Sequence, residues 1–576
     1  MTREKPWHQF YSNVPKSLDY PKINMYEAVL RTARRVPEKV AWDFMGTCCT
    51  YKNFVRQISI CANALSFLGL KKGETITISM PTTPQGLICF YAANKLGARA
   101  SMIHPLSTES EIEYYLNLSK STMALTLDAF YDKFDRVMEK TGCNTLIIAR
   151  IGDYLPLLKK MGFWLTKGRK IPAIPADNRV HFWKDLLAAD YAEAPDGEMD
   201  FEDTAVILYS GGTTGTPKGI MLSNKNFISE GMMVASWGDL DENDTILAIL
   251  PIFHGFGLGV CAHAAFTAGA KSILVPQFTP ETVARLIKTQ KPNFIIGVPT
   301  LYAALNKSKD FKHADLSCLK AAFSGADTLP LTIKTEFEQI VQSRGGDVKL
   351  LEGYGLTEAV TAIMAMPLDH FRKGSVGIPF PDMDAKIVGE DTQEELPVGE
   401  DGEMCISGPA VMQGYLDNQK ETDHALRKHD DGKIWLHTGD IASRDADGFF
   451  YFKLRQKRMI KSSGMNVYPA QVEAVLFKHP YVADVCVIGV PDRDQVEAVK
   501  AFVVLKPGIA GDTSTEEELI SHCRKDLIKW SCPRSIEFRK ELPTTAVGKV
   551  AFNTLKKEEL ENRRKNNEYT GEENHD

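Results

Sequence analysis

A dense run of glycine and hydroxyl residues is the strongest chemical signal in this 576-residue sequence. It reads SGGTTGTPKG over residues 210–219 and directly follows the apolar run 204–209. Closely spaced glycines and hydroxyls let backbone N–H and side-chain O–H groups surround phosphate oxygens, and a lysine adds positive charge. The run is not a Walker A loop, because Pro217 precedes the lysine and Gly219 follows it. We therefore predict a nucleotide-phosphate site made by Ser210, Gly211, Gly212, Thr213, Thr214, Gly215, Thr216 and Lys218.

Four more motifs follow this loop along the chain. They are YGLTE (354–358), WLHTGD (435–440), RQKRMIK (455–461) and PTTAVGK (543–549). In this order the five motifs resemble the adenylate-forming superfamily of acyl-CoA synthetases and other AMP-binding enzymes, and particularly bacterial long-chain fatty-acid:CoA ligases. The resemblance extends from about residue 25 to residue 557. It implies an ATP-dependent enzyme that converts a carboxylic acid to an acyl-adenylate and then transfers the acyl group to coenzyme A.

The resemblance also implies roles for individual residues. Negative charge accumulates when a carboxylate attacks the α-phosphorus of ATP, so the site needs a metal ion and cations. Glu358 and Thr213 would hold Mg²⁺, Thr357 would contact phosphate, and Lys549 would be the mobile catalytic cation. The remaining nucleotide contacts would come from Gly325, Ala326, Tyr354, Gly355, Asp440 and Arg455, with the last two on the ribose. The segment SGAD at 324–327 departs from the common GGAP form, and Val547 stands where the family often has serine.

Residues near the C-terminus are expected to serve the second half-reaction. By resemblance, Lys457 lies at a hinge about which a small domain rotates between adenylation and thioester formation. Ser463 and Gly464 would then line the channel for CoA, where a missing side chain leaves room for a narrow thiol arm. A plain turn remains the alternative interpretation of Gly464.

The segment PIFHGFG at 251–257 resembles the wall of the family's acyl pocket. We predict that the pocket is formed by Phe253, His254, Phe256, Gly257 and Leu258, with His254 also near the reacting carboxylate. No acidic residue occurs in these stretches to receive an amino acid's ammonium group, which weakens the interpretation as a peptide-synthetase domain. The alternatives that stay open are an aryl or steroid acid:CoA ligase, a ligase that loads an acyl carrier protein, a luciferase-like oxygenase and a non-enzymatic homologue.

The elements that must position these motifs alternate between short apolar runs and helical patterns. Runs such as 75–80 and 294–298 alternate with helical patterns such as 54–68 and 281–289, which predicts an α/β fold with mainly parallel sheets. We expect a large N-terminal AMP-binding domain at 1–454 that includes a β-barrel-like subdomain. A small mobile α+β domain follows at 455–557, with predicted helices at 471–478 and 516–530, and a charged tail ends the chain at 558–576.

Composition restricts the partners and the location. The net charge of −6 argues against binding of nucleic acid, and the scattered cysteines show no zinc-site spacing. We expect a cytoplasmic protein, because no signal peptide is visible and the uncharged stretch 245–270, with its glycines and Pro251, fits a buried strand, turn and helix. The basic and aromatic segment 154–170 could contact the inner face of the membrane, or be a solvated loop. The oligomeric state is left open.

Overall fold

The computed structural model describes residues 5–194, 197, 200–210, 217–389, 392–455, 458, 460–462, 465–467, 469–492, 496–527, 529–544 and 550–565. The chain divides into two compact units. The first contains Met1–Ala385, Cys405–His437 and Ala446–Phe449, and the second contains Lys386–Met404, Thr438–Asp445 and Phe450–Asp576.

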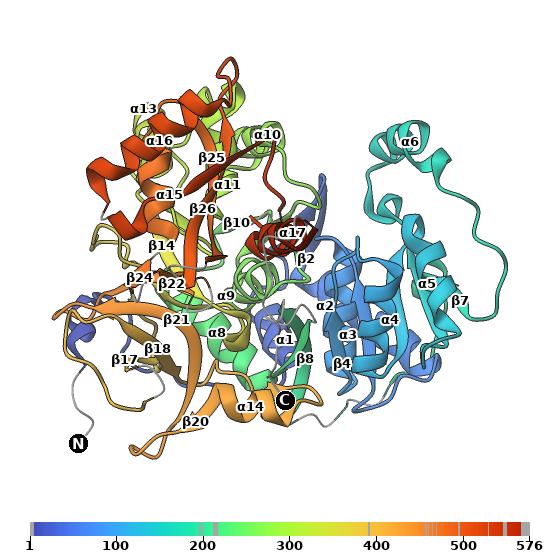
Figure 1. The fold of residues 1–576 in the computed structure, drawn as a ribbon. Helices are drawn as coiled ribbons and strands as arrows, with labels where there is room; N and C mark the ends of the chain where they lie inside the picture. The colour runs from blue at the N-terminus through green and yellow to red at the C-terminus, as the bar shows by residue number, and fades with distance from the viewer. Residues whose placement is uncertain are drawn as a thin grey trace. The chain divides into compact units, whose positions relative to one another are not determined.

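A nine-stranded sheet carries several of the predicted site segments (Figure 1). In spatial order its strands are β16 (Ile378–Pro379), β15 (Ala362–Ala365), β14 (Leu350–Gly355), β13 (Ala321–Ser324), β12 (Phe294–Gly297), β10 (Thr245–Ala248), β11 (Lys271–Leu274), β1 (Val40–Phe44) and β2 (Thr47–Thr50). The strands from β14 to β1 are parallel, as expected for a β–α alternation. A buried cluster that includes Ile295, Tyr302 and Phe337 joins this sheet to the helices α11 (Pro299–Lys307) and α13 (Leu331–Ser343).

A second, eight-stranded sheet holds the start of the glycine-rich loop. Its strands in spatial order are β19 (Gly414–Tyr415), β9 (Lys218–Ser223), β8 (Thr204–Ser210), β4 (Arg99–Met102), β3 (Thr75–Ser79), β5 (Ser121–Leu127), β6 (Thr145–Ala149) and β7 (Val180–Phe182). Strands β8 and β9 pair antiparallel, with Ser210 opposite Lys218. The two ends of the loop are therefore held side by side by backbone hydrogen bonds.

Helices surround both sheets, and several of them begin at a residue whose side chain caps the helix. They are α1 (Met25–Arg35), α2 (Tyr51–Phe67), α3 (Pro84–Lys95), α4 (Glu109–Ser119), α5 (Tyr131–Met138), α6 (Leu157–Thr166), α7 (Trp183–Ala188), α8 (Asn224–Trp237), α9 (Ala265–Ala268), α10 (Pro280–Gln290), α11 (Pro299–Lys307), α12 (Lys309–Lys312), α13 (Leu331–Ser343) and α14 (Gln419–Ala425). Helix α8 starts where the Ser223 Oγ accepts a hydrogen bond from the Asn226 N–H at 3.2 Å. The Asn226 side chain also donates to the Pro409 and Val411 carbonyls, each at 2.8 Å. These two bonds hold the start of α8 against the segment 409–411.

The uncharged stretch 245–270 lies inside the first unit. It forms β10, the π-helix η5 (Phe256–Ala264), α9 and the turn that leads to β11, and its residues from Gly257 to Phe266 are buried. The predicted strand, turn and helix are thus observed. In the part of the chain that the structure describes, no helix combines the length and apolar character needed to cross a membrane.

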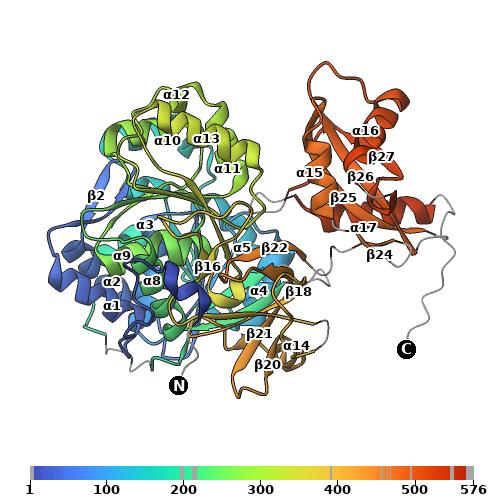
Figure 2. The ribbon, with the colours of Figure 1, turned by 90° about the vertical axis from the view of Figure 1, so that its left-hand side faces the viewer.

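A third sheet has the strand order β17 (Asp384–Val388), β18 (Gly402–Ser407), β21 (Ile434–Arg444) and β20 (Leu426–Lys428), with β22 (Phe450–Arg455) paired to β21. The C-terminal segment forms its own sheet in the order β24 (Met465–Val467), β23 (Ile460–Ser462), β26 (Val496–Leu505) and β25 (Val482–Asp492), with β27 (Ser535–Arg539) beside β26. Figure 2 shows α15 (Pro469–Phe477), α16 (Thr513–Asp526) and α17 (Phe552–Lys565) packed around this last sheet. Apolar residues such as Val472, Val487 and Leu519 form its core.

Candidate functional site

Three parallel strands of the nine-stranded sheet end directly at predicted site segments. Strand β10 leads into 251–258, β13 into 325–327 and β14 into Thr357 and Glu358. Ligands of open α/β sheets bind outside the carboxyl ends of the strands, so the fold brings these segments to the expected edge. Segments that are far apart in the sequence therefore lie close together at this edge of the sheet.

Glu358 lies beside the start of the glycine-rich loop and next to Tyr415. Its Oε1 accepts a hydrogen bond from the Ser210 Oγ at 3.3 Å and another from the Tyr415 hydroxyl at 3.0 Å. Because carboxylate and hydroxyl oxygens are the ligands that Mg²⁺ prefers, this donor set fits the magnesium role predicted for Glu358. When bound, the metal would neutralise phosphate charge.

Lys218, at the other end of the loop, has partners that the sequence motifs did not reveal. Its Nζ pairs with the Glu421 carboxylate and lies 4.8 Å from the centre of the Tyr415 ring. Tyr415 thus contacts both Lys218 and Glu358. Its strand β19 pairs with β9, and this pairing brings residues about 200 positions apart in the chain into one cluster. In the sequence, Tyr415 stands in an apolar, strand-like stretch. Such stretches are too common for the sequence alone to identify Tyr415 as a site residue.

The segment after β14 has a tight and strained backbone. A Cβ at Gly355 would lie 1.4 Å from the Thr361 carbonyl oxygen, so only glycine fits there. Val360 has φ of 61° and ψ of −66°, an unfavourable conformation for a β-branched residue. Such strain is concentrated at functional sites, because packing must hold the backbone in a rare geometry. Thr357 and Tyr354 are buried on either side of Gly355.

The predicted acyl-pocket residues lie at the start of η5 and next to Gly325 of the segment 324–327. The His254 Nδ1 accepts from the Phe256 N–H at 3.1 Å, and the Phe253 ring lies 4.4 Å from the ring of His104. Phe256 packs on Gly325, since a Cβ there would be 3.3 Å from its ring atoms. Leu258 is fully buried, and Gly257 lies directly against the Pro251 backbone. Ala326 follows Gly325 with a φ of 72°.

The two residues predicted to contact ribose occupy opposite positions on neighbouring strands. Asp440 on β21 pairs with Arg455 on β22 in the antiparallel register. Asp440 is buried, and its N–H donates to the Thr438 Oγ1 at 3.1 Å. This pairing places the two residues next to each other across the two strands, as contact with one ribose requires.

Several predicted residues lie outside the described part of the chain. They are Gly211, Gly212, Thr213, Thr214, Gly215, Thr216, Lys457, Ser463, Gly464 and Lys549. Their predicted roles, and the predicted domain boundaries, stay predictions.

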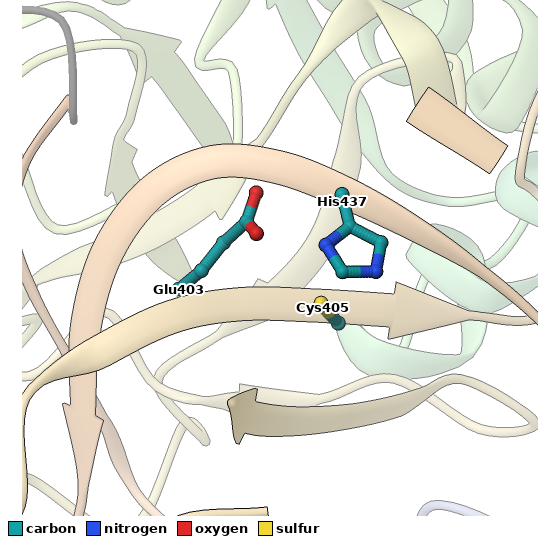
Figure 3. A group of neighbouring side chains, drawn as sticks. All are labelled: Glu403, Cys405 and His437. Carbon is teal, nitrogen blue, oxygen red and sulfur yellow. The ribbon is translucent and has the colours of Figure 1, made fainter. Parts of the chain in front are cut away.

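A separate group of metal-binding side chain types occurs in the third sheet. Ligand atoms of Glu403, Cys405 and His437 lie within 4.8 Å of one another, and Figure 3 shows the three side chains gathered along neighbouring strands. The Gly439 N–H donates to the Glu403 Oε1 at 2.9 Å, and His429 shares a hydrogen bond of 2.9 Å with the His437 Nε2. These bonds explain the positions of Glu403 and His437 without a metal, and we assign no metal to the group.

One acidic residue close to the predicted acyl pocket was missed. Glu230, on α8, is fully buried, and a Cβ added at Gly259 of η5 would lie 2.8 Å from its Oε2. The prediction that the pocket segments contain no acid is correct for the segments themselves, but the fold brings an acid from another helix. The signal was available, because Glu230 is the only charged residue in the stretch 226–238.

Comparison with known proteins agrees with this geometry. The family model described as AMP-binding enzyme matches residues 29–416, and the model of the AMP-binding enzyme C-terminal domain matches residues 471–549. The chain belongs to the AMP-binding enzyme family. This AMP-binding enzyme is 37% identical over 570 residues to a long-chain-fatty-acid–CoA ligase of Bacillus subtilis (strain 168), a match that covers 98% of this chain and 99% of the relative.

Solved structures with bound nucleotides are similar in fold. An ATP-bound RpMatB–BxBclM chimera matches with a TM-score of 0.82 and 26% identity over 93% of this chain and 99% of its own. The anthranilate CoA ligase AuaEII, in complex with anthranoyl-AMP, matches with a TM-score of 0.80 and 26% identity over 95% of this chain and 98% of its own. The predicted superfamily, α/β fold class and class of reaction, an ATP-dependent acid:CoA ligation through an acyl-adenylate, are confirmed.

Proposed function

We propose that this enzyme activates a medium- or long-chain fatty acid with ATP and Mg²⁺ and transfers the acyl group to CoA. The observation that carries the proposal is the cluster of Ser210, Lys218 and Glu358 around Tyr415, at the two ends of a glycine-threonine loop. The apolar lining of the predicted pocket and the name of the Bacillus relative support an aliphatic acid. No observation favours the aryl, steroid or carrier-protein alternatives.

The chain's own groups have distinct tasks in this mechanism. The loop from Ser210 to Lys218 holds the phosphates. Glu358 would hold Mg²⁺, which would supply positive charge to offset that of the phosphates. Asp440 and Arg455 hold the ribose. Lys549 stabilises the charge that develops between the carboxylate and the α-phosphate, and removing one such preorganised group typically costs about 10²–10³ in rate.

Pyrophosphate release with a panel of fatty, aryl and steroid acids, with and without CoA, tests the substrate class. We expect CoA-dependent turnover on alkyl acids and acyl-CoA as the product in mass spectrometry. Pyrophosphate release that CoA does not accelerate would point to a carrier protein as the acceptor. No turnover on alkyl acids, with turnover on aryl acids, would refute the proposal.

The two half-reactions can be separated by variants. Lys549→Ala should abolish formation of acyl-adenylate but spare CoA transfer from supplied acyl-adenylate, and Gly464→Leu should do the reverse. Lys540→Ala, at an exposed lysine of the same domain, is the matched control and should leave both steps intact. Equal damage to both steps in each active-site variant would contradict a rotation about the proposed hinge at Lys457.

A cytoplasmic location with contact to an anionic membrane surface is the second part of the proposal. Helix α6 has no buried residue, and it exposes Leu157, Leu158, Met161, Trp164 and Leu165 at helical spacing. Five exposed cations lie in the same segment, at Lys159, Lys160, Lys167, Arg169 and Lys170, and no acid occurs from residue 154 to 176. Apolar area combined with positive charge is what binds a peripheral helix to anionic lipid.

Figure 1 shows α6 in the long connection between β6 and β7. Its Lys159 Nζ donates to the Met45 carbonyl at 2.5 Å, which ties this end of the connection to the first unit. A large exposed apolar patch on a helix lowers the solubility of a protein. Binding of α6 to a membrane surface would explain why these side chains are exposed.

Sedimentation with vesicles tests the membrane contact. The protein should bind vesicles that contain phosphatidylglycerol more tightly than pure phosphatidylcholine, and Leu158→Ser with Trp164→Ser should abolish the difference. Phe67→Ser, at another exposed aromatic outside α6, is the control and should bind as the wild type does. Equal binding to both vesicle types, or unchanged binding of the double variant, would refute this contact without affecting the proposed ligase activity.

A further inference from the structure

Glu230 is a buried acid whose hydrogen bonding is incomplete. Its side chain is 0% exposed. The Oε1 accepts a single long hydrogen bond from the Ala362 N–H, at 3.4 Å. In the described residues, the Oε2 has no hydrogen-bond partner, and no charge of a Lys, Arg or His acts on the carboxyl group. A purely structural acid in a protein interior normally has both oxygens satisfied, so the free oxygen requires an explanation.

The free oxygen lies among segments already assigned to the acyl pocket. A Cβ at Gly259 would be 2.8 Å from the Glu230 Oε2 and 3.2 Å from the Val360 Cγ1. Gly259 follows Leu258 in η5, and Val360 is two residues after Glu358 in the strained turn. The carboxyl group therefore lies where the pocket segment meets the segment that follows the metal-binding glutamate.

Two features of η5 favour a ligand at this point. It is a π-helix, an arrangement that is rare in proteins and frequent at functional sites. Glycine at 259 leaves out the side chain that would otherwise cover the Oε2. Helices α8 and η5 are closely packed beside this point, because a Cβ at Gly231 of α8 would be 2.9 Å from the His263 ring of η5.

The protonation state of Glu230 limits what it can bind. Burial raises the pKa of this carboxyl group to about 8, while the Ala362 N–H lowers it. At pH 7 the group is therefore mainly neutral, and it can donate one hydrogen bond as well as accept others. Such a group suits an uncharged oxygen on a ligand better than an ammonium ion.

We propose that Glu230 determines acyl specificity, with its free carboxyl oxygen hydrogen-bonded to a hydroxyl or oxo group on the acyl chain. The inference rests on the proposed fatty-acid:CoA ligase activity and narrows it to oxygenated fatty acids. A plain alkyl chain would leave the buried oxygen without a partner, and sites built to bond a polar group discriminate against analogues that lack it. One hydrogen bond of this kind corresponds to a preference of about three- to tenfold in kcat/KM.

The test measures kcat/KM for CoA-thioester formation with hexadecanoic acid and with its monohydroxy and monooxo derivatives. The derivatives differ in the chain position that carries the oxygen. The wild type should prefer one position of substitution over the plain acid. Glu230→Met, which keeps the length and removes the polar group, should lose that preference and retain turnover of the plain acid. Glu230→Gln, which still forms hydrogen bonds, should keep part of it.

Ser229→Ala provides the matched control. Ser229 is the neighbouring residue on α8, is fully buried and also has an oxygen without a partner in the described part of the chain, but it is no part of the proposed site. Its variant should keep the wild-type preference. If the Met variant does not fold, the comparison of positional isomers in the wild type and the Gln variant still decides the question.

Two results would overturn the proposal. They are equal kcat/KM for all the acids in the wild type, and a preference that survives Glu230→Met. Turnover of plain alkyl acids with no preference would refute only the role of Glu230. Absence of turnover with every alkyl acid, oxygenated or not, would refute the proposed function together with this inference.

Discussion

Two apolar segments of the first unit end in opposite environments. Helix η5 and its neighbours, in the stretch 245–270, are enclosed between β10, α8 and the turn at Val360, whereas α6 exposes most of its large apolar side chains. Leu258 is 0% exposed and Leu158 is 83% exposed. Both segments are rich in apolar residues, so hydropathy alone does not distinguish a buried helix from an exposed one. The flanking residues do: η5 is flanked by glycines and strands, and α6 by lysines and an arginine.

The largest expected effect comes from filling space in the buried segment. In Gly257→Ala the new Cβ would lie 2.2 Å from the Pro251 carbonyl oxygen, a backbone atom that cannot move away easily. We expect a loss of roughly 3 kcal/mol or more in the free energy of unfolding, measured by urea denaturation. Wild-type stability in this variant would show that η5 is packed more loosely than the structure indicates.

Truncation of a leucine tests the same contrast in both segments. Leu258→Ala should cost about 2–5 kcal/mol of unfolding free energy, because it leaves a cavity in the core. Leu158→Ala should change stability by less than about 0.5 kcal/mol, since the side chain is already in water. Similar losses of unfolding free energy in the two variants would mean that α6 is covered in solution. The contrast between η5 and α6 would then be wrong.

The buried segment should also carry a pH dependence. Folding raises the pKa of Glu230 from 4.5 to about 8, so the folded state holds this proton more tightly and stability falls as the pH rises through that window. Glu230→Gln cannot ionise, and relative to wild type it should gain on the order of 3 kcal/mol between pH 5 and pH 8. Thermal denaturation at the two pH values measures this gain. Glu400→Gln, at an exposed acid, is the control, and parallel profiles for all three proteins would contradict the assignment.

The smallest effect is expected in the exposed helix. Gly162 lies inside α6, and nothing lies within 4 Å of a Cβ added there. Gly162→Ala should therefore raise the unfolding free energy by about 0.5–1 kcal/mol through helix propensity alone. The same chemical change thus has opposite signs at Gly162 and Gly257. A destabilised Gly162→Ala protein would show that α6 packs against another surface.

The boundaries of the elements show what local patterns can predict. The helix predicted at 281–289 is α10, Pro280–Gln290, whose start is fixed by the Thr279 side chain. The helix predicted at 516–530 is α16, which begins at Thr513 because the Asp512 side chain accepts from the Thr515 N–H, and ends at Asp526, where Leu527 turns to extended backbone. Type and place were predictable from periodicity, and the exact ends depended on single caps.

The sequence by itself determined the family and the reaction class, because these depend on motifs whose residue types and spacing are local. Tertiary structure decided which distant groups complete the site. Tyr415 and Glu421 reach the loop through the pairing of β19 with β9, and Glu230 reaches the pocket through the packing of α8 on η5. Tertiary structure also decided that 245–270 is buried while α6 is exposed. Burial and contact depend on long-range packing, and the spacing of residues in one segment does not encode what another segment will place against it.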